Sequence, residues 1–165
     1  MKFILYVTLL SMEKDVKIIA TNKKAEHDYF IESRFEAGIV LHGCEVCSLR
    51  ENSASLRDSY GQIKNGELWL INTYIAPYSH GNIFNVATRR NRKLLLHKKQ
   101  IKKIAVKVKE RGYTIVPLSM YFAANNKVKV EIAICKGKHK YDKRESIKQR
   151  DIKRDIARSL KEMNR

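Results

Sequence analysis

A strict alternation of apolar and polar residues between Lys127 and Ile134 limits the fold of this chain more than any other feature. The apolar positions are Val128, Val130, Ile132 and Ile134. A period of two residues is typical of a β-strand with one face buried and the other exposed to solvent. The alternation ends near Cys135, and a basic stretch begins at Lys136. We therefore expect a β-structured body followed by a basic arm of different character.

Turn signals and further strand-like runs precede this strand. Asn65-Gly66 is the strongest turn signal, because a type I′ turn requires a positive φ at both central residues. It separates the strand-like runs 56–63 and 67–75 and so predicts a β-hairpin. Other strand-like runs cover 16–20, 29–41 and 113–122. Gly38 indicates a bulge or a close backbone approach, and Pro117 indicates an edge or bulged strand.

Two segments have the spacing of a helix. The stronger one has an apolar stripe opposite a row of lysines, and Gly112 is a suitable stop after it. Its apolar residues are Ile101, Ile104, Ala105 and Val108. A shorter helical segment covers 45–50. About five or six short strands with one internal helix predict a mainly β fold. We expect a small closed OB-fold-like β-barrel with one or two short helices and a basic C-terminal tail.

These boundaries predict how the chain is divided. Residues 16–140 are expected to form the barrel, residues 141–165 a flexible basic tail, and residues 1–15 a disordered leader. The apolar run 3–10 in the leader is too short to cross a membrane, and no small-x-small cleavage site follows it. Met12 is a second candidate, beside Met1, for the true start of the protein.

The charge balance favours a polyanionic partner. The chain has 34 Lys and Arg against 17 Asp and Glu, which gives a formal net charge of +17. From Lys136 onward there are twelve basic residues and five acidic ones. Charge of this sign and size suits a nucleic acid first and an anionic membrane second. We expect RNA binding and no membrane association.

The cysteines and the absence of catalytic motifs narrow the function further. Cys44, Cys47 and Cys135 are too few for a disulfide framework and are typical of a reducing compartment, so we expect a cytoplasmic protein. Cys44 and Cys47 form a CxxC motif, and His42 or His139 could serve as further ligands. Zinc requires four ligands, however, and the sequence has no second CxxC pair. We expect no metal and no cofactor. Walker-type phosphate loops, GxSxG elbows and HExxH motifs are absent from the sequence, so we expect no enzymatic activity.

A short strand-like run, Lys93-Leu94-Leu95-Leu96-His97, suggests how RNA is bound. Alternation along a strand places Lys93, Leu95 and His97 on one face. A face with a cation, an apolar side chain and an imidazole suits a folded RNA with unstacked bases better than a plain duplex. In the alternative interpretation, Leu95 is simply part of the core.

The order of motifs from about residue 18 to residue 165 resembles the bacterial SsrA-binding protein family. The matching pieces are Asn22-Lys23-Lys24-Ala25, His27-Asp28-Tyr29, Phe35-Glu36-Ala37-Gly38-Ile39, Gly43-Cys44-Glu45-Val46-Cys47-Ser48-Leu49-Arg50, Asp58-Ser59-Tyr60, Arg92-Lys93-Leu94-Leu95-Leu96-His97 and Gly137-Lys138-His139-Lys140-Tyr141-Asp142-Lys143-Arg144. Each piece alone is modest, but all of them in this order are highly specific. The resemblance implies an OB-fold barrel that binds the tRNA-like domain of transfer-messenger RNA and delivers it to stalled ribosomes for trans-translation.

The resemblance also implies which residues bind RNA. Glu36, Leu95 and His97 fall on the RNA-binding face. The full set of expected RNA-binding residues is Asn22, Lys23, Lys24, His27, Glu36, Arg50, Arg92, Lys93, Leu95, His97, Lys138 and Lys140. The sequence departs from the family pattern at Cys47, where Lys is common, and near Asn52-Ser53, where Gly-Lys is common. Loss of these cations would weaken one RNA contact.

The family implies a separate role for the tail, which is unstructured when free and folds as a helix in the ribosome's decoding centre and empty messenger channel. The expected tail residues are Gly137, Tyr141, Asp142, Lys143, Arg144, Ile152, Ile156 and Leu160. The sequence agrees, because the apolar stripe from Ile152 through Ile156 to Leu160 is too narrow to hold a helix without a partner. We expect a monomer on the RNA. The rival interpretation is a basic, ribosome-associated structural RNA-binding protein with no cycle of delivery.

Overall fold

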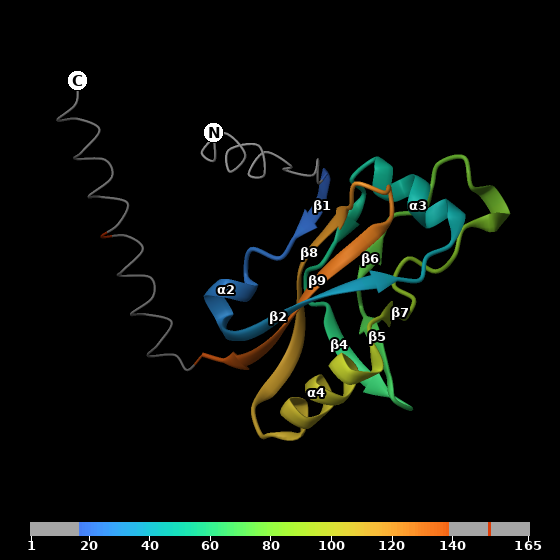
Figure 1. Ribbon diagram of the computed structural model, residues 1–165. Coiled ribbons are helices and arrows are strands. Elements are labelled where there is room, and N and C mark those ends of the chain that lie inside the picture. The colour runs from blue at the N-terminus through green and yellow to red at the C-terminus, as the bar shows by residue number, and fades with distance from the viewer. Residues whose placement is uncertain (1–16, 139–151, 153–165) are drawn as a thin grey trace, which may run out of the picture.

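A long hairpin forms the centre of the computed structural model, which describes residues 17–138 and 152 (Figure 1). Its strands are β8 (Tyr113–Phe122) and β9 (Val128–Gly137), which pair antiparallel along their whole length. The strand predicted from alternation is therefore confirmed as β9. The register shifts between Pro117 and Ser119, which confirms the bulge predicted at Pro117. Residues 1–15 and most of the expected tail lie outside the described residues.

The strands close into a ring. β2 (Tyr29–Ile39) pairs with β9, and β7 (Arg92–Leu95) pairs with β2. β5 (Glu67–Ile71) and β4 (Tyr60–Lys64) continue the sheet, and the contact of β4 with β8 closes it. β1 (Lys17–Thr21) pairs with β8, while β3 (Ala54–Ser55) and β6 (Tyr74–Ile75) form a separate pair. The predicted mainly β architecture with a closed sheet is confirmed.

The core fills the ring with aliphatic side chains from every strand. Fully buried members include Leu68, Leu70, Leu94, Met120, Val130 and Ile132. A second cluster lies on the other side of the β8–β9 hairpin, where Ala25, Val116, Leu118, Ala133 and Cys135 pack together. This explains why β9 is buried on both faces near its end, although its sequence alternates. Burial raises the pKa of the Cys135 thiol to about 11, which is typical of an inert structural cysteine.

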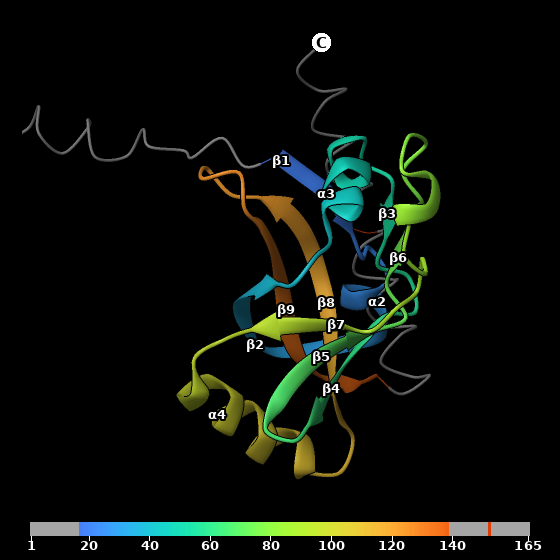
Figure 2. The same ribbon diagram turned by 90° about the vertical axis from the view of Figure 1, so that its right-hand side faces the viewer.

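Three α-helices lie outside the ring in the described part of the chain, one more than the sequence predicted. They are α2 (Ala25–Asp28), α3 (Gly43–Arg50) and α4 (Lys98–Lys109), and η1 (Asn82–Phe84) adds one turn of 3₁₀-helix. α4 follows β7 and covers one end of the ring with its buried Ile104 (Figure 2). Gly112, with φ +92°, follows it as predicted. Among the described residues, no helix is long and apolar enough to cross a membrane.

Backbone conformation explains where the strand predictions succeed and fail. Asn65 and Gly66 both have positive φ, 51° and 74°, so the predicted hairpin is confirmed. The single strand predicted over 67–75 is wrong, because Asn72 has a φ of 60° and divides it into β5 and β6. The run 56–63 becomes a strand only at Tyr60, after Asp58 with a φ of 58°. Asparagine and aspartate tolerate the left-handed region, so both breaks have a local cause.

A buried carboxylate connects α3 to β7. Glu45 is 3% exposed, and it accepts hydrogen bonds from Arg92 Nε at 2.9 Å and Arg90 Nε at 3.0 Å. The backbone N–H of His42 also donates to Glu45, at 2.8 Å. Arg92 itself is 0% exposed and donates to the carbonyls of Thr73 and Thr88. The buried charges are therefore paired and hydrogen-bonded, as burial of charge requires.

Gly61 closes the ring because it has no side chain. It pairs with Leu70 on one side and Ile115 on the other, and a Cβ built on it would lie 2.5 Å from Cγ2 of Ile115. We expect Gly61→Ala to lower the free energy of unfolding by about 1–3 kcal/mol, measured by urea denaturation. Gly43→Ala is the matched control, because a Cβ there meets nothing within 4 Å. Equal stability of the two variants would contradict this account.

The hydrogen bonds and ion pairs of Glu45 predict that the stability of the fold depends on pH. Burial on its own would raise the pKa of Glu45, but the hydrogen bonds from Arg90 and the His42 backbone and the charge of Arg92 outweigh it, so the pKa is lowered from 4.5. A lowered folded-state pKa stabilises the fold above the unfolded value, and this stabilisation is lost as the pH falls through the folded value.

We expect Glu45→Gln to lower the free energy of unfolding by about 3 kcal/mol at neutral pH, because it leaves the buried Arg92 and the half-buried Arg90 without a charge partner. The difference in free energy of unfolding between the variant and the unmutated protein should shrink below pH 4.5, because Glu45 of the unmutated protein becomes protonated. Urea denaturation across this pH range measures it, with the exposed Glu51→Gln as control. A difference that stays constant with pH would contradict an ionic role for Glu45.

Candidate nucleic-acid interface

β7 presents its side chains alternately to the core and to solvent. Arg92 and Leu94 are buried, whereas Lys93 is half-buried and Leu95 is 52% exposed. The interpretation of Leu95 as a core residue is therefore wrong. His97 lies beyond the end of the strand, where it caps α4, and its backbone N–H donates to Gln100 Oε1 at 3.2 Å. It is nevertheless exposed on the same part of the surface.

A depression of about 530 Å³ brings together the three residues that the family resemblance places on the RNA-binding face. We call it the platform; its lining residues are Glu36, Gly38, Leu95, Leu96, His97, Gln100 and Lys129. They come from β2, β7, β9 and the start of α4, which are remote in sequence but adjacent in the sheet. The platform therefore offers a carboxylate, an apolar surface, an imidazole and a cation within one concave area.

Gly38 shapes the floor of the platform. It pairs with Leu95 on β7 and with Lys129 on β9. A Cβ on Gly38 would lie 3.3 Å from the Cβ of Leu95, which is tighter than ordinary contact. The absence of a side chain therefore leaves the flank of Leu95 open. This is the close backbone approach that was one of the two predictions for Gly38. The other prediction, a bulge at Gly38, is wrong, because the register shift in β2 lies between Ile31 and Ser33.

Two residues that the sequence analysis missed hold the carboxylate of Glu36. Tyr121 on β8 donates its hydroxyl to one oxygen, and Lys129 on β9 donates to the other. Burial, followed by the hydrogen bond to Glu36, raises the pKa of Tyr121, so its hydroxyl remains a donor. The sequence did indicate that Lys129 faces solvent, because it is a polar position of the alternating strand. Predicting that Lys129 and Tyr121 contact Glu36 required the strand order, in which β9 pairs with both β2 and β8.

The remaining predicted RNA-binding residues lie in other places. Lys93 forms an ion pair with Glu67 near the platform, and Arg50 is exposed on α3. Arg92 differs from the other described candidates, because it is fully buried and forms an ion pair with Glu45, so it cannot reach a ligand at the surface. We therefore assign Arg92 to the core rather than to RNA.

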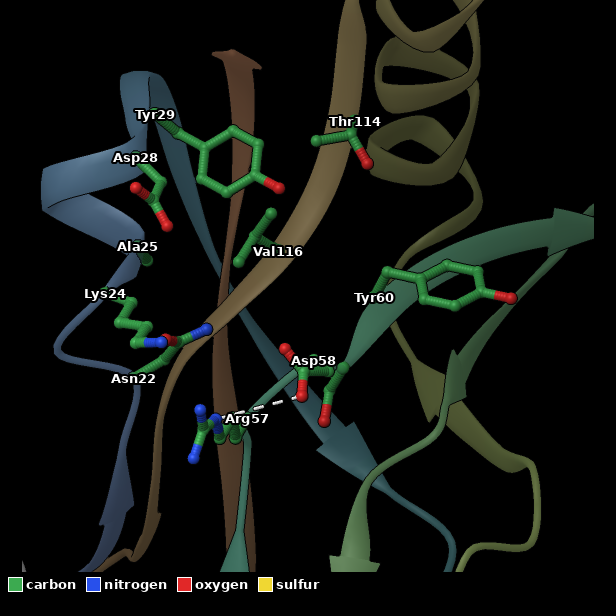
Figure 3. Close-up of a pocket in the computed structure, with 11 residues that line it drawn as sticks. Asn22, Lys24, Ala25, Asp28, Tyr29, Arg57, Asp58, Tyr60, Thr114 and Val116 are labelled. Carbon is green, nitrogen blue, oxygen red and sulfur yellow. Dashed lines mark ion pairs between the residues drawn. The ribbon is translucent and has the colours of Figure 1, made fainter. Parts of the chain in front are cut away.

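The first motif lies at the opposite end of β2, beside a second pocket of about 320 Å³ (Figure 3). Asn22 and Lys24 line it together with Asp28, Arg57 and Asp58, and Asn22 donates to the carbonyl of Pro117 at 3.2 Å. Three motif pieces of the family resemblance, 22–25, 27–29 and 58–60, thus meet in this pocket. Lys23 is exposed nearby in the chain, and His27 contacts Asp28 at 2.9 Å.

The start of the tail is also at this end. Gly137 ends β9, and Nζ of Lys138 donates to the carbonyl of Glu26 at 2.9 Å while lying 5.0 Å from the centre of the Phe30 ring. Ile152 is 57% exposed. The other expected tail and RNA-binding residues, Lys140, Tyr141, Asp142, Lys143, Arg144, Ile156 and Leu160, lie outside the described residues.

The CxxC forms no metal site with other described residues. Cys44 and Cys47 are half-buried on α3, and Sγ of Cys44 donates to the carbonyl of Phe84 at 3.2 Å. In the described part of the chain, no group of three or more His, Cys, Asp or Glu side chains is arranged to hold a metal ion. The contact of Cys44 instead connects α3 to the η1 turn.

Comparison with known proteins extends these observations. The model of the SmpB protein family matches residues 19–162. SsrA-binding protein from Fervidobacterium nodosum is 56% identical over 146 residues, which cover 88% of this chain and 98% of that protein. SsrA-binding protein from Rickettsia canadensis is 56% identical over 151 residues, which cover 92% of this chain and 99% of that protein.

A solved structure, described as "tmRNA-SmpB: a journey to the center of the bacterial ribosome", has a similar fold. The TM-score is 0.63 and the sequence identity 42%, with 77% of this chain and 92% of that chain covered. The chain belongs to the SmpB family of SsrA-binding proteins.

Proposed function

We propose that this chain binds the tRNA-like domain of transfer-messenger RNA and delivers it to stalled ribosomes as the adaptor of trans-translation. The observation that carries the proposal is the platform, where Glu36, Leu95 and His97 share one depression. Relatives at more than half identity are named SsrA-binding protein, and the structural neighbour is described with tmRNA and the bacterial ribosome. The chain acts by binding rather than by catalysis, and it works in the cytoplasm with the ribosome.

The chemistry of the platform suits a folded RNA. Leu95 offers an exposed apolar surface for an unstacked base, and Lys129 offers a cation for phosphate. A carboxylate such as Glu36, oriented by Tyr121 and Lys129, accepts hydrogen bonds from base amino groups and from 2′-hydroxyls. A duplex presents neither accessible bases nor a shape that fits a depression between strands, so recognition of an irregular RNA is favoured.

The division of labour between body and tail is part of the proposal. The body, residues 16–140, holds the RNA at the platform, and the tail, residues 141–165, enters the decoding centre and messenger channel. Lys138 is held against α2, so the tail starts away from the platform. The residues near this exit, among them Lys23 and Lys24, add basic surface there.

The experiment that tests RNA recognition is a binding titration of the full chain against transfer-messenger RNA and an unrelated tRNA, at roughly 50 and 200 mM salt. We expect tight binding to the first that persists at the higher salt, and weak binding to the second. Glu36→Ala should weaken the binding of transfer-messenger RNA at least about tenfold, because the platform loses its oriented acceptor. Its melting temperature should stay close to that of the unmutated protein, because Glu36 is at the surface.

Glu26→Ala is the matched control, since Glu26 is also an exposed carboxylate in an ion pair, with Arg34 at 3.4 Å on the far end of the body. Its affinity should be unchanged. Equal, steeply salt-dependent binding of both RNAs would contradict specific recognition and leave only attraction to phosphate. A large loss of thermal stability in Glu36→Ala would show that Glu36 is structural.

Truncation of the tail separates this proposal from the rival, a basic structural protein of the ribosome. We expect deletion of residues 142–165 to leave the affinity for transfer-messenger RNA within a few-fold and to abolish tagging in a reconstituted translation assay. A variant with the same residues in scrambled order keeps the charge but loses the stripe of Ile152, Ile156 and Leu160, and it should also fail to tag. Parallel loss of RNA binding and tagging would contradict separate roles for body and tail.

A further inference from the structure

The first half of helix α4 carries four exposed lysines that the platform does not include. We call them the lysine face: Lys98, Lys99, Lys102 and Lys103. None of them forms an ion pair with an acidic residue in the described part of the chain. The sequence contains no Asp or Glu between Glu67 and Glu110, so neighbouring positions supply no local counter-charge. A surface of this kind attracts a polyanion.

The fold holds this face in a fixed direction. Ile104 is buried against the ring, so the opposite side of α4 is turned to solvent. Near the end of the helix, Nζ of Lys107 forms an ion pair with Glu32 of β2 at 2.8 Å and lies 5.4 Å from the centre of the Tyr113 ring. Lys107 therefore anchors α4, whereas no ion pair between described residues accounts for the charges of the lysine face.

The arrangement is unfavourable for the isolated helix. Lys98 and Lys99 lie in the first turn, where the helix dipole favours anions, and this turn contains no acidic residue. Lys98 and Lys102 are four residues apart, as are Lys99 and Lys103, and like charges at this spacing repel each other. A role in folding therefore does not explain the lysine face.

We propose that the lysine face binds the phosphate backbone of the RNA whose unstacked bases occupy the platform. α4 follows β7 in the chain (Figure 2) and begins directly after His97. Both His97 and Gln100 line the platform, so the two surfaces are continuous. Each turn of the helix advances about 5.4 Å, so Lys98 and Lys102 present successive charges along one line. The inference rests on the proposed function and extends its RNA-binding surface beyond the residues of the family motifs.

The test measures how affinity for transfer-messenger RNA depends on salt. In the variant with Lys98, Lys99, Lys102 and Lys103 all changed to Gln, we expect the slope of log K against log salt to fall by about 2–4, roughly one for each lost phosphate contact. The affinity at moderate salt should fall at least about tenfold. The melting temperature of the free protein should stay the same or rise, because repulsion in α4 is relieved.

A pair of double variants provides the matched control. Lys98→Gln with Lys102→Gln should lower the slope and the affinity, whereas Lys109→Gln with Arg111→Gln should change neither appreciably, although the net charge falls equally. Lys109 and Arg111 are exposed at the end of α4 that is remote from the platform, just before β8 begins at Tyr113. Equal effects of the two double variants would overturn the inference, because they would show a general effect of net charge.

Two further outcomes would also overturn it. Loss of RNA affinity together with a clear fall in melting temperature would make the lysines structural. Unchanged RNA affinity in the fourfold variant, with loss of binding to phosphatidylglycerol vesicles, would assign the face to a membrane surface. Failure of the proposed function is distinguishable, because the unmutated chain would then bind transfer-messenger RNA and tRNA equally.

Discussion

The platform depends on buried charges that do not themselves line it. Glu45 is buried on α3, and it is paired with Arg90 and with the fully buried Arg92. Removing such charges from water is unfavourable unless each is compensated, and here the carboxylate and three carbonyl oxygens accept from Arg92. Arg92 is the first residue of β7 and Leu95 is the last. Because side chains alternate along a strand, holding Arg92 inside directs Leu95 outward.

The platform is a product of strand order as much as of residue type. Glu36, Lys129 and Tyr121 lie on β2, β9 and β8, which are neighbours in the closed sheet. Their hydrogen bonds run across the strands and fix the direction of the carboxylate. Gly38 keeps the space beside Leu95 open. A small change at any of these positions would alter the shape of the surface without touching the core.

Much of the fold could be predicted from the sequence, because its signals are local. The alternation of β9, the Asn65-Gly66 turn and the stripe on α4 each depend on a few adjacent residues, and all three are confirmed. The break at Asn72 was missed, because asparagine in the left-handed region is allowed but not required by the sequence. The four-residue helix α2 has too few residues to show a period.

The site was predictable only in part, again because some of its residues are close together in the sequence and others are far apart. Lys93, Leu95 and His97 are close in sequence, so alternation could place them on one side. Glu36 came from the family resemblance, while Lys129 and Tyr121 required knowledge of which strands are neighbours. Arg92 was misassigned to RNA because a basic residue in a basic cluster resembles a phosphate contact. Only the distant Glu45, which carries the opposite charge, makes burial of Arg92 favourable.

The long β2–β9 pair gives the proposed adaptor its geometry. Glu36 and Gly38 line the platform near one end of β2, while Tyr29 at the other end pairs with Gly137, just before the tail. At about 3.3 Å per residue, the strand separates these points by roughly 23–30 Å. A hydrogen-bonded pair of strands bends little, so RNA held at the platform has a nearly constant distance from the start of the tail. A rigid spacer of this kind allows the binding of one RNA to position a segment that acts elsewhere, which a flexible linker between the two sites would not achieve.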